Sequence, residues 1–106
     1  MNPTSGADGG SVEIRIRNDS NVDFDRVQVQ FPDQDEVDYG PIPKGDVTDF
    51  RATTRAYRYA GVSVKTGDQH LSLQPIDYMG ETELSAGRYT YSLDVNNGQL
   101  TIQLEK

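Results

Sequence analysis

The stretch from residue 89 to residue 104 reads YTYSLDVNNGQLTIQL. Large apolar side chains occupy alternate positions in it, both before and after Asn97 and Gly98. A period of two predicts strands with one buried face and one solvated face. The Asn-Gly pair favours the positive φ angles of a tight turn. The stretch therefore predicts an antiparallel β-hairpin.

The same period of two continues through most of the chain. Further strands are predicted at 12–17, 27–31, 60–65 and 70–74, with short ones at 36–39 and 48–52. Residues 49–57 could instead hold one helical turn. Residues 66–69 read as a hairpin turn, and the prolines of residues 40–45 are expected to end the strand before them because they lack an N–H group. The prediction is an all-β fold, an immunoglobulin-like antiparallel β-sandwich of seven or eight short strands.

The length of 106 residues fits one domain. Residues 1–11 are expected to be a flexible Gly-rich lead or tether, and residues 12–106 the sandwich domain. Leu, Ile, Val and Phe together make up only 23 residues, so nearly all of them must face inward. The chain has no cysteine, which excludes disulfides, thiolate nucleophiles and Cys-ligated metal centres.

The formal net charge of −7 makes nucleic acid and anionic lipid poor partners. Residues 1–50 carry 11 acidic and 4 basic side chains, whereas residues 51–106 carry 6 of each. No three consecutive residues are apolar, so no membrane span is expected. The expected partner is an unknown protein or glycan at the cell surface.

The segment from Leu84 to Tyr91 follows the pattern Leu-x-x-Gly-x-Tyr-x-Tyr. A glycine before the strand permits a tight corner, and the hydroxyl of Tyr89 can then bond a backbone carbonyl a few residues upstream. This pattern resembles the tyrosine corner of immunoglobulin-like and fibronectin-type sandwiches. The resemblance implies that Tyr89 opens the penultimate strand. The cysteine pair and the tryptophan of antibody domains are missing.

The layout also resembles small exported bacterial β-sandwich domains of uncharacterised role, which are often lipoproteins. The shared features are the Gly-rich lead, the Val-x-Ile-x-Ile-x-Asn-Asp-Ser segment from Val12, the Tyr39–Ile42 segment and the Leu84 pattern. This resemblance implies a periplasmic or outer-envelope location, with a possible lipid anchor on an N-terminal cysteine that this sequence lacks. If Met1 is native, the expected location is cytoplasmic.

Catalytic residues are not expected. His70 is the only histidine, and no Gly-x-Ser-x-Gly elbow accompanies it. We therefore interpret His70 as a surface strand residue. The chain is not expected to be an enzyme or to bind a cofactor.

A calcium site is the alternative. Asp33, Asp35 and Asp38 supply hard oxygen ligands within six residues. They do not match the spacing of a calcium-binding loop, so a solvated acidic loop is the competing interpretation. With calcium bound, these residues would make the chain a calcium-dependent carbohydrate-binding module.

Tyr57, Arg58 and Tyr59 form the candidate contact surface. The tyrosines have the opposite parity from Ala60, Val62 and Val64, so both rings face outward if the strand is regular. Outward aromatic rings can anchor a protein or stack on a sugar. A bulge near Ala60 would instead turn the rings inward. The arginines of residues 51–58 are otherwise expected to pair with the acidic first half. The leading hypothesis is a non-catalytic binding or scaffolding module of the bacterial cell envelope.

Overall fold

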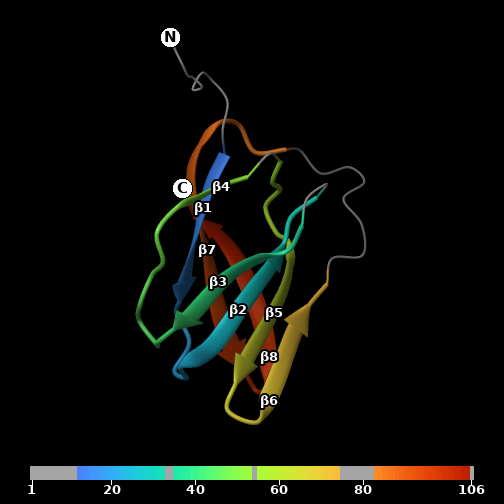
Figure 1. The fold of residues 1–106 in the computed structure, drawn as a ribbon. Helices are drawn as coiled ribbons and strands as arrows, with labels where there is room; N and C mark the ends of the chain where they lie inside the picture. Colours follow the sequence, from blue (N-terminus) through green and yellow to red (C-terminus); the bar gives the residue numbers. More distant parts are fainter. Residues whose placement is uncertain (1–11, 33–34, 54, 75–82, 106) are drawn as a thin grey trace.

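The computed structural model describes residues 12–32, 35–53, 55–74 and 83–105. They form an all-β sandwich of two four-stranded sheets (Figure 1). One sheet has the order β4-β1-β7-β8 and the other the order β3-β2-β5-β6. The strands are β1 (Val12–Asn18), β2 (Phe24–Gln30), β3 (Val37–Ile42), β4 (Arg51–Thr53), β5 (Gly61–Thr66), β6 (Gln69–Leu73), β7 (Gly87–Asn96) and β8 (Gln99–Glu105). The predicted fold class is confirmed.

The two predicted hairpins are present. β7 and β8 pair antiparallel from Asn96 opposite Gln99 onward, and the turn residues Asn97 and Gly98 have φ angles of 53° and 77°. Two consecutive positive φ angles are the geometry that Asn-Gly favours. β5 and β6 are also joined by a two-residue turn, residues 67–68. Turn chemistry therefore sets the register of four strands.

One pair departs from the expected antiparallel arrangement. β1 and β7 run parallel, with Val12 opposite Gly87 and Asn18 opposite Leu93. No hairpin constrains this pair, because the chain visits the other sheet between the two strands. The two strands are parallel because the chain enters both of them from the same end of the sheet.

The third strand is longer than predicted. β3 continues through Gly40 and Pro41 to Ile42, which pairs with Phe24, so the expectation that residues 40–45 cannot continue a ladder is wrong for 40–42. β3 is an edge strand with two register shifts against β2. An edge and an irregular register both tolerate a proline without an N–H group. β4 covers only residues 51–53, and the alternative helical turn is absent from the described part of 49–57.

The two open sides of the sandwich differ. On the side of β3, the buried Tyr39 donates a hydrogen bond from its hydroxyl to the carbonyl of Ile14 in the opposite sheet, 3.0 Å away. On the other side, β6 and β8 lie next to each other (Figure 1). Four of their inward-facing side chains pack against the core but are only partly buried. They are Leu71, Leu73, Ile102 and Leu104. The core is therefore closed on the β3 side and accessible on the β6–β8 side.

Candidate functional site

The segment Ala56-Tyr57-Arg58-Tyr59-Ala60 arches over the accessible side. Its two alanines are completely buried, and they anchor the segment because a methyl group fits where larger side chains would not. The amide of Leu84 donates to the carbonyl of Ala56 at 2.9 Å. The hydroxyl of Tyr91 donates to the carbonyl of Tyr57 at 2.6 Å. The three residues between the alanines are thus held at a fixed place on the surface.

The alternation predicted for Tyr57 and Tyr59 does not apply. β5 begins at Gly61, and residues 55–60 are irregular. Their backbone bonds to a tyrosine hydroxyl and to residue 84 instead of to a neighbouring strand, so strand parity cannot orient the side chains. Both tyrosines are half-buried, which matches neither the outward nor the fully inward expectation.

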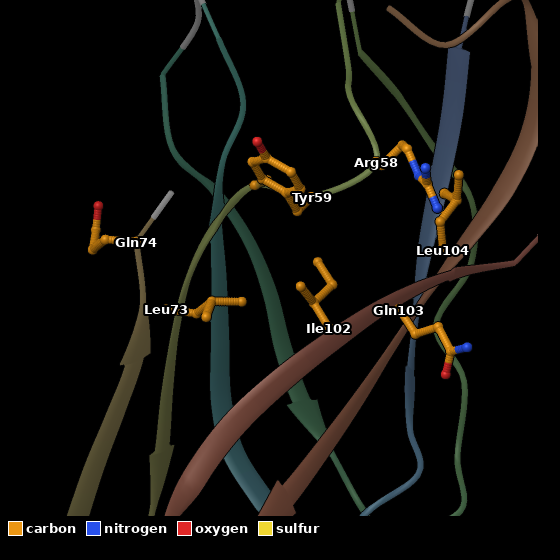
Figure 2. Close-up of a pocket in the computed structure, with 8 residues that line it drawn as sticks. Arg58, Tyr59, Leu73, Gln74, Ile102, Gln103 and Leu104 are labelled. Atoms are coloured by element: carbon orange, nitrogen blue, oxygen red, sulfur yellow. The ribbon is translucent and has the colours of Figure 1, made fainter. Parts of the chain in front are cut away.

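A groove of about 500 Å³ lies beneath this segment, between β6 and β8. Figure 2 shows Leu73 and Ile102 pointing into the space beside the Tyr59 ring, and Arg58 extending beside Leu104. Gln74 and Gln103 point away from that space. A second hollow, lined by residues 70–73 and 98–100, continues along the same two strands. The groove therefore has an aliphatic floor and a mouth formed by a phenol and a guanidinium group.

Arg58 differs from the other arginines. Each of those lies against a carboxylate or an aromatic ring: Arg17, Arg26, Arg55 and Arg88 form ion pairs, and Arg15 and Arg51 lie over the rings of Phe50 and Tyr39. Arg58 is exposed and has no such partner among the described residues. Arg55 pairs with Glu83 of the second half, whereas Arg51 lies over the Tyr39 ring and its charge helps to lower the pKa of Asp38 of the first half. The mouth of the groove thus holds an uncompensated positive charge.

The structure describes two of the three acidic residues of the calcium hypothesis. Asp33 lies outside the described residues, and Asp35 is exposed. Asp38 accepts hydrogen bonds from Arg26, the nearer at 2.7 Å, and from the amide of Gly40 at 2.8 Å. The bond from Arg26 contributes most to lowering the pKa of Asp38 below its ordinary value. Within the described ranges, no three His, Asp or Glu side chains gather as metal ligands, and the calcium hypothesis stays a prediction.

His70 is an exposed residue of β6, as expected. Its Nε2 lies 2.7 Å from the hydroxyl of Ser63 on β5. A catalytic pair of this kind needs a third group that orients the imidazole and donors for an oxyanion. In the described part of the chain no side chain bonds Nδ1, and Ser63 is not among the groove residues. The pair is a cross-strand hydrogen bond on the outer face of the sheet.

A third hollow of about 310 Å³ lies by the loop after β3 and includes Tyr39 and Arg51. Its arginine is already placed over the Tyr39 ring, 5.1 Å from the ring centre. Burial raises the pKa of Tyr39 well above its usual range, which keeps the phenol neutral and able to donate to Ile14. These contacts close the sandwich, so the groove between β6 and β8 is the better candidate site.

Sequence reasoning found only part of this site. Arg58 and Tyr59 line the groove as predicted contact residues, whereas Tyr57 is not among the lining residues and contributes its carbonyl to Tyr91. The floor residues Leu73, Ile102 and Leu104 were assigned to the core by their period. The missed signal is charge: residues 69–74 and 99–104 contain no Asp, Glu, Lys or Arg, although a quarter of the chain is charged.

Comparisons with family models, with curated proteins and with solved structures find no match for this chain. The resemblance to immunoglobulin-like and exported bacterial domains therefore stays a prediction. The hydroxyl of Tyr89 does donate to the carbonyl of Ser85 at 2.8 Å, which is the hydrogen bond expected of the tyrosine corner. Over the described residues, no helix is long and apolar enough to span a membrane.

Proposed function

We propose that the chain is a non-catalytic binding module whose ligand site is the groove between β6 and β8. The observation that supports this most is the unpaired Arg58 guanidinium at the mouth of an aliphatic groove. Seventeen carboxylates are available in the sequence, yet none in the described part pairs with this arginine. An exposed cation beside partly buried leucines suits a ligand with an apolar body and an anionic group.

The proposed site is tested by NMR titration of the full chain. Medium-chain carboxylates such as decanoate, and short apolar peptides, are added to the ¹⁵N-labelled protein. We expect shifts clustered on residues 58–60, 73–74 and 102–104. The variant Ile102→Asp, which places a carboxylate on the groove floor, should abolish them. A matched variant on the outer face of β8, Thr101→Asp, should leave them unchanged. Shifts that cluster on the hollow beside Tyr39 would contradict the proposal.

We further propose that the module works at the bacterial cell envelope. The support is the sequence resemblance carried by the Val12, Tyr39 and Leu84 segments. Fractionation of cells that express the native gene with a C-terminal tag tests this setting. Recovery with the periplasmic or membrane-associated fraction is expected, and recovery with the cytoplasmic fraction would contradict it.

A further inference from the structure

We propose that the groove binds an extended polypeptide segment of a partner protein, which adds to the edge of β8 as a further strand and places a carboxylate on Arg58. This inference rests on the proposed function, because it names the class of partner for the same groove. It draws on the edges of the sheets, the distribution of charge and the spacing of the floor residues.

The four edge strands are not equally protected. Natural proteins protect sheet edges with prolines, bulges, charges or very short strands. β3 has Pro41 and two register shifts, β4 has only three residues, and β6, the edge strand across the groove from β8, has five. β8 has seven residues in unbroken register with β7, and it pairs with no other strand of the described chain. Its backbone edge is therefore suited to accept a strand.

The accessible side is also free of repulsion. The molecule carries a net charge of −7, but residues 69–74 and 99–104 have no charged side chain. A partner strand can therefore approach β6 and residues 99–104 of β8 without meeting a carboxylate, and the carboxylate of Glu105 at the end of β8 is paired with Arg17. Arg58 then provides the only charge among the groove residues, and that charge is positive. The positive charge of Arg58 would attract a partner that places a carboxylate beside it. It would favour a second copy of this acidic chain less.

The floor has the period that a strand requires. Ile102 and Leu104 line the groove while Gln103 points away (Figure 2). A strand added beside β8 has the same alternation, so its every second side chain would face Leu73 and Leu104. β8 can pair over roughly 20 Å at about 3.3 Å per residue. The expected partner segment thus has aliphatic residues at alternate positions and an acidic group, or a C-terminus, beside Arg58.

The test uses four probes on the full-length protein. The first is a synthetic peptide of about seven residues that alternates valine with threonine and ends in a free carboxylate. The second is the same peptide with a C-terminal amide, the third has its valines contiguous, and the fourth is decanoate. Binding is located by ¹H–¹⁵N shifts, and strand addition is detected as slower hydrogen exchange of the edge amides of β8, which are those that point away from β7.

We expect the alternating acid peptide to bind and to protect β8 amides. Its amide form should bind roughly tenfold more weakly, because a charge-assisted hydrogen bond to Arg58 is lost. The variant Arg58→Gln should remove the difference between acid and amide. Lys65→Gln, which removes an exposed cation from β5, is the matched control and should preserve that difference.

The other outcomes show whether strand addition fails alone or whether the groove also fails as a ligand site. Decanoate shifts at the groove without peptide binding would overturn strand addition and leave the groove as a ligand site. No shift at the groove with any probe would overturn both. A dimer in sedimentation, with the edge amides of β8 protected in the absence of peptide, would show that a second copy occupies the edge. Protection of those amides in the free monomer would show that the chain itself covers the edge. Either result would overturn strand addition by a partner.

Discussion

Asn18 is completely buried although it is polar. Its Nδ2 donates to the carbonyls of Val22 and Ile42, both at 2.8 Å, and its Oδ1 accepts from the amide of Ser20 at 2.9 Å. Its backbone groups bond to residues 45 and 46. One side chain thus joins the end of β1 to the following turn and to the end of β3. Sequence reasoning could not detect these bonds, because the carbonyl of Ile42 lies 24 residues away from Asn18.

Replacing Asn18 with Ala is expected to lower the free energy of unfolding by about 3 kcal/mol, because the buried carbonyl of Ile42 and the amide of Ser20 lose the partner that Asn18 provides and the carbonyl of Val22 loses one of two. Asn18→Asp should cost at least as much at pH 7, where a carboxylate would face two carbonyls. Its difference from the wild type should shrink at pH 4, since a protonated carboxyl can donate one bond. Urea titrations measure both variants. Asn21→Ala, at an exposed neighbour, is the control, and a cost as large as that of Asn18→Ala would refute the role of burial.

Tyr91 and Tyr89 provide a second matched pair at this scale. Both are buried in β7, and each hydroxyl donates to a backbone carbonyl, that of Tyr57 or of Ser85. Either change to Phe should cost about 1 kcal/mol of unfolding free energy. Tyr91→Phe should shift the NMR signals of Arg58 and Tyr59 more than Tyr89→Phe does, because Tyr91 bonds the carbonyl next to Arg58 directly. Equal shifts in both variants would contradict this positioning role.

At the scale of elements, the sequence patterns predicted the features that depend on residues close together in the chain. The Asn-Gly hairpin, the alternation in β1, β5 and β8 and the corner at Tyr89 all depend on neighbours in sequence, and they were found. The extension of β3 through Pro41 depends on its place at an edge, and the parallel pairing of β1 depends on the route of the chain. The arch at Arg58 depends on Tyr91, which lies 34 residues beyond Tyr57. The periodicity of the sequence cannot predict any of these three features.

A polar network joins three strands of one sheet. Arg17 on β1 contacts Asp19 at 2.8 Å and Glu105 on β8 at 2.6 Å, and Ser92 of β7 donates to Asp19. Burial pushes the pKa of Asp19 upward, but the hydrogen bonds from Ser92 and Arg17 together outweigh it and hold the pKa below its ordinary value. The network therefore depends on an ionised Asp19.

This network predicts a pH dependence of stability. A lowered folded-state pKa stabilises the protein above the unfolded value, about 3.9 for Asp. That stabilisation is lost as the pH falls through the folded-state value. Asp19→Asn should be less stable than the wild type at pH 7, by about 1 kcal/mol or less because the group is partly exposed. The difference should shrink as the pH falls below the unfolded-state value. Asp49→Asn, at an exposed residue, should show no such trend, and a constant deficit for Asp19→Asn would refute the mechanism.

At the scale of the whole molecule, charge is segregated. The turn after β1, the loop after β3 and the turn between β5 and β6 meet at one end of the sandwich (Figure 1). The carboxylate of Asp23 accepts from the amide of Lys44 at 3.0 Å, and that of Asp25 from the amide of Gly67 at 2.8 Å. This end carries five aspartates, namely Asp19, Asp23, Asp25, Asp46 and Asp68. Among the described residues that line the groove, in contrast, Arg58 carries the only charge.

Segregation of this kind predicts that salt stabilises the fold. Like charges at one end repel one another, and raising sodium chloride from about 0.02 M to 0.5 M shortens the screening length from roughly 20 Å to 4 Å. We expect the Tm measured by calorimetry to rise by roughly 2–5 °C. Asp68→Asn, which removes one charge from the acidic end, should raise Tm at low salt and flatten its salt dependence. A Tm that falls with salt would mean that screened ion pairs such as Arg17–Glu105 outweigh the repulsion among the aspartates.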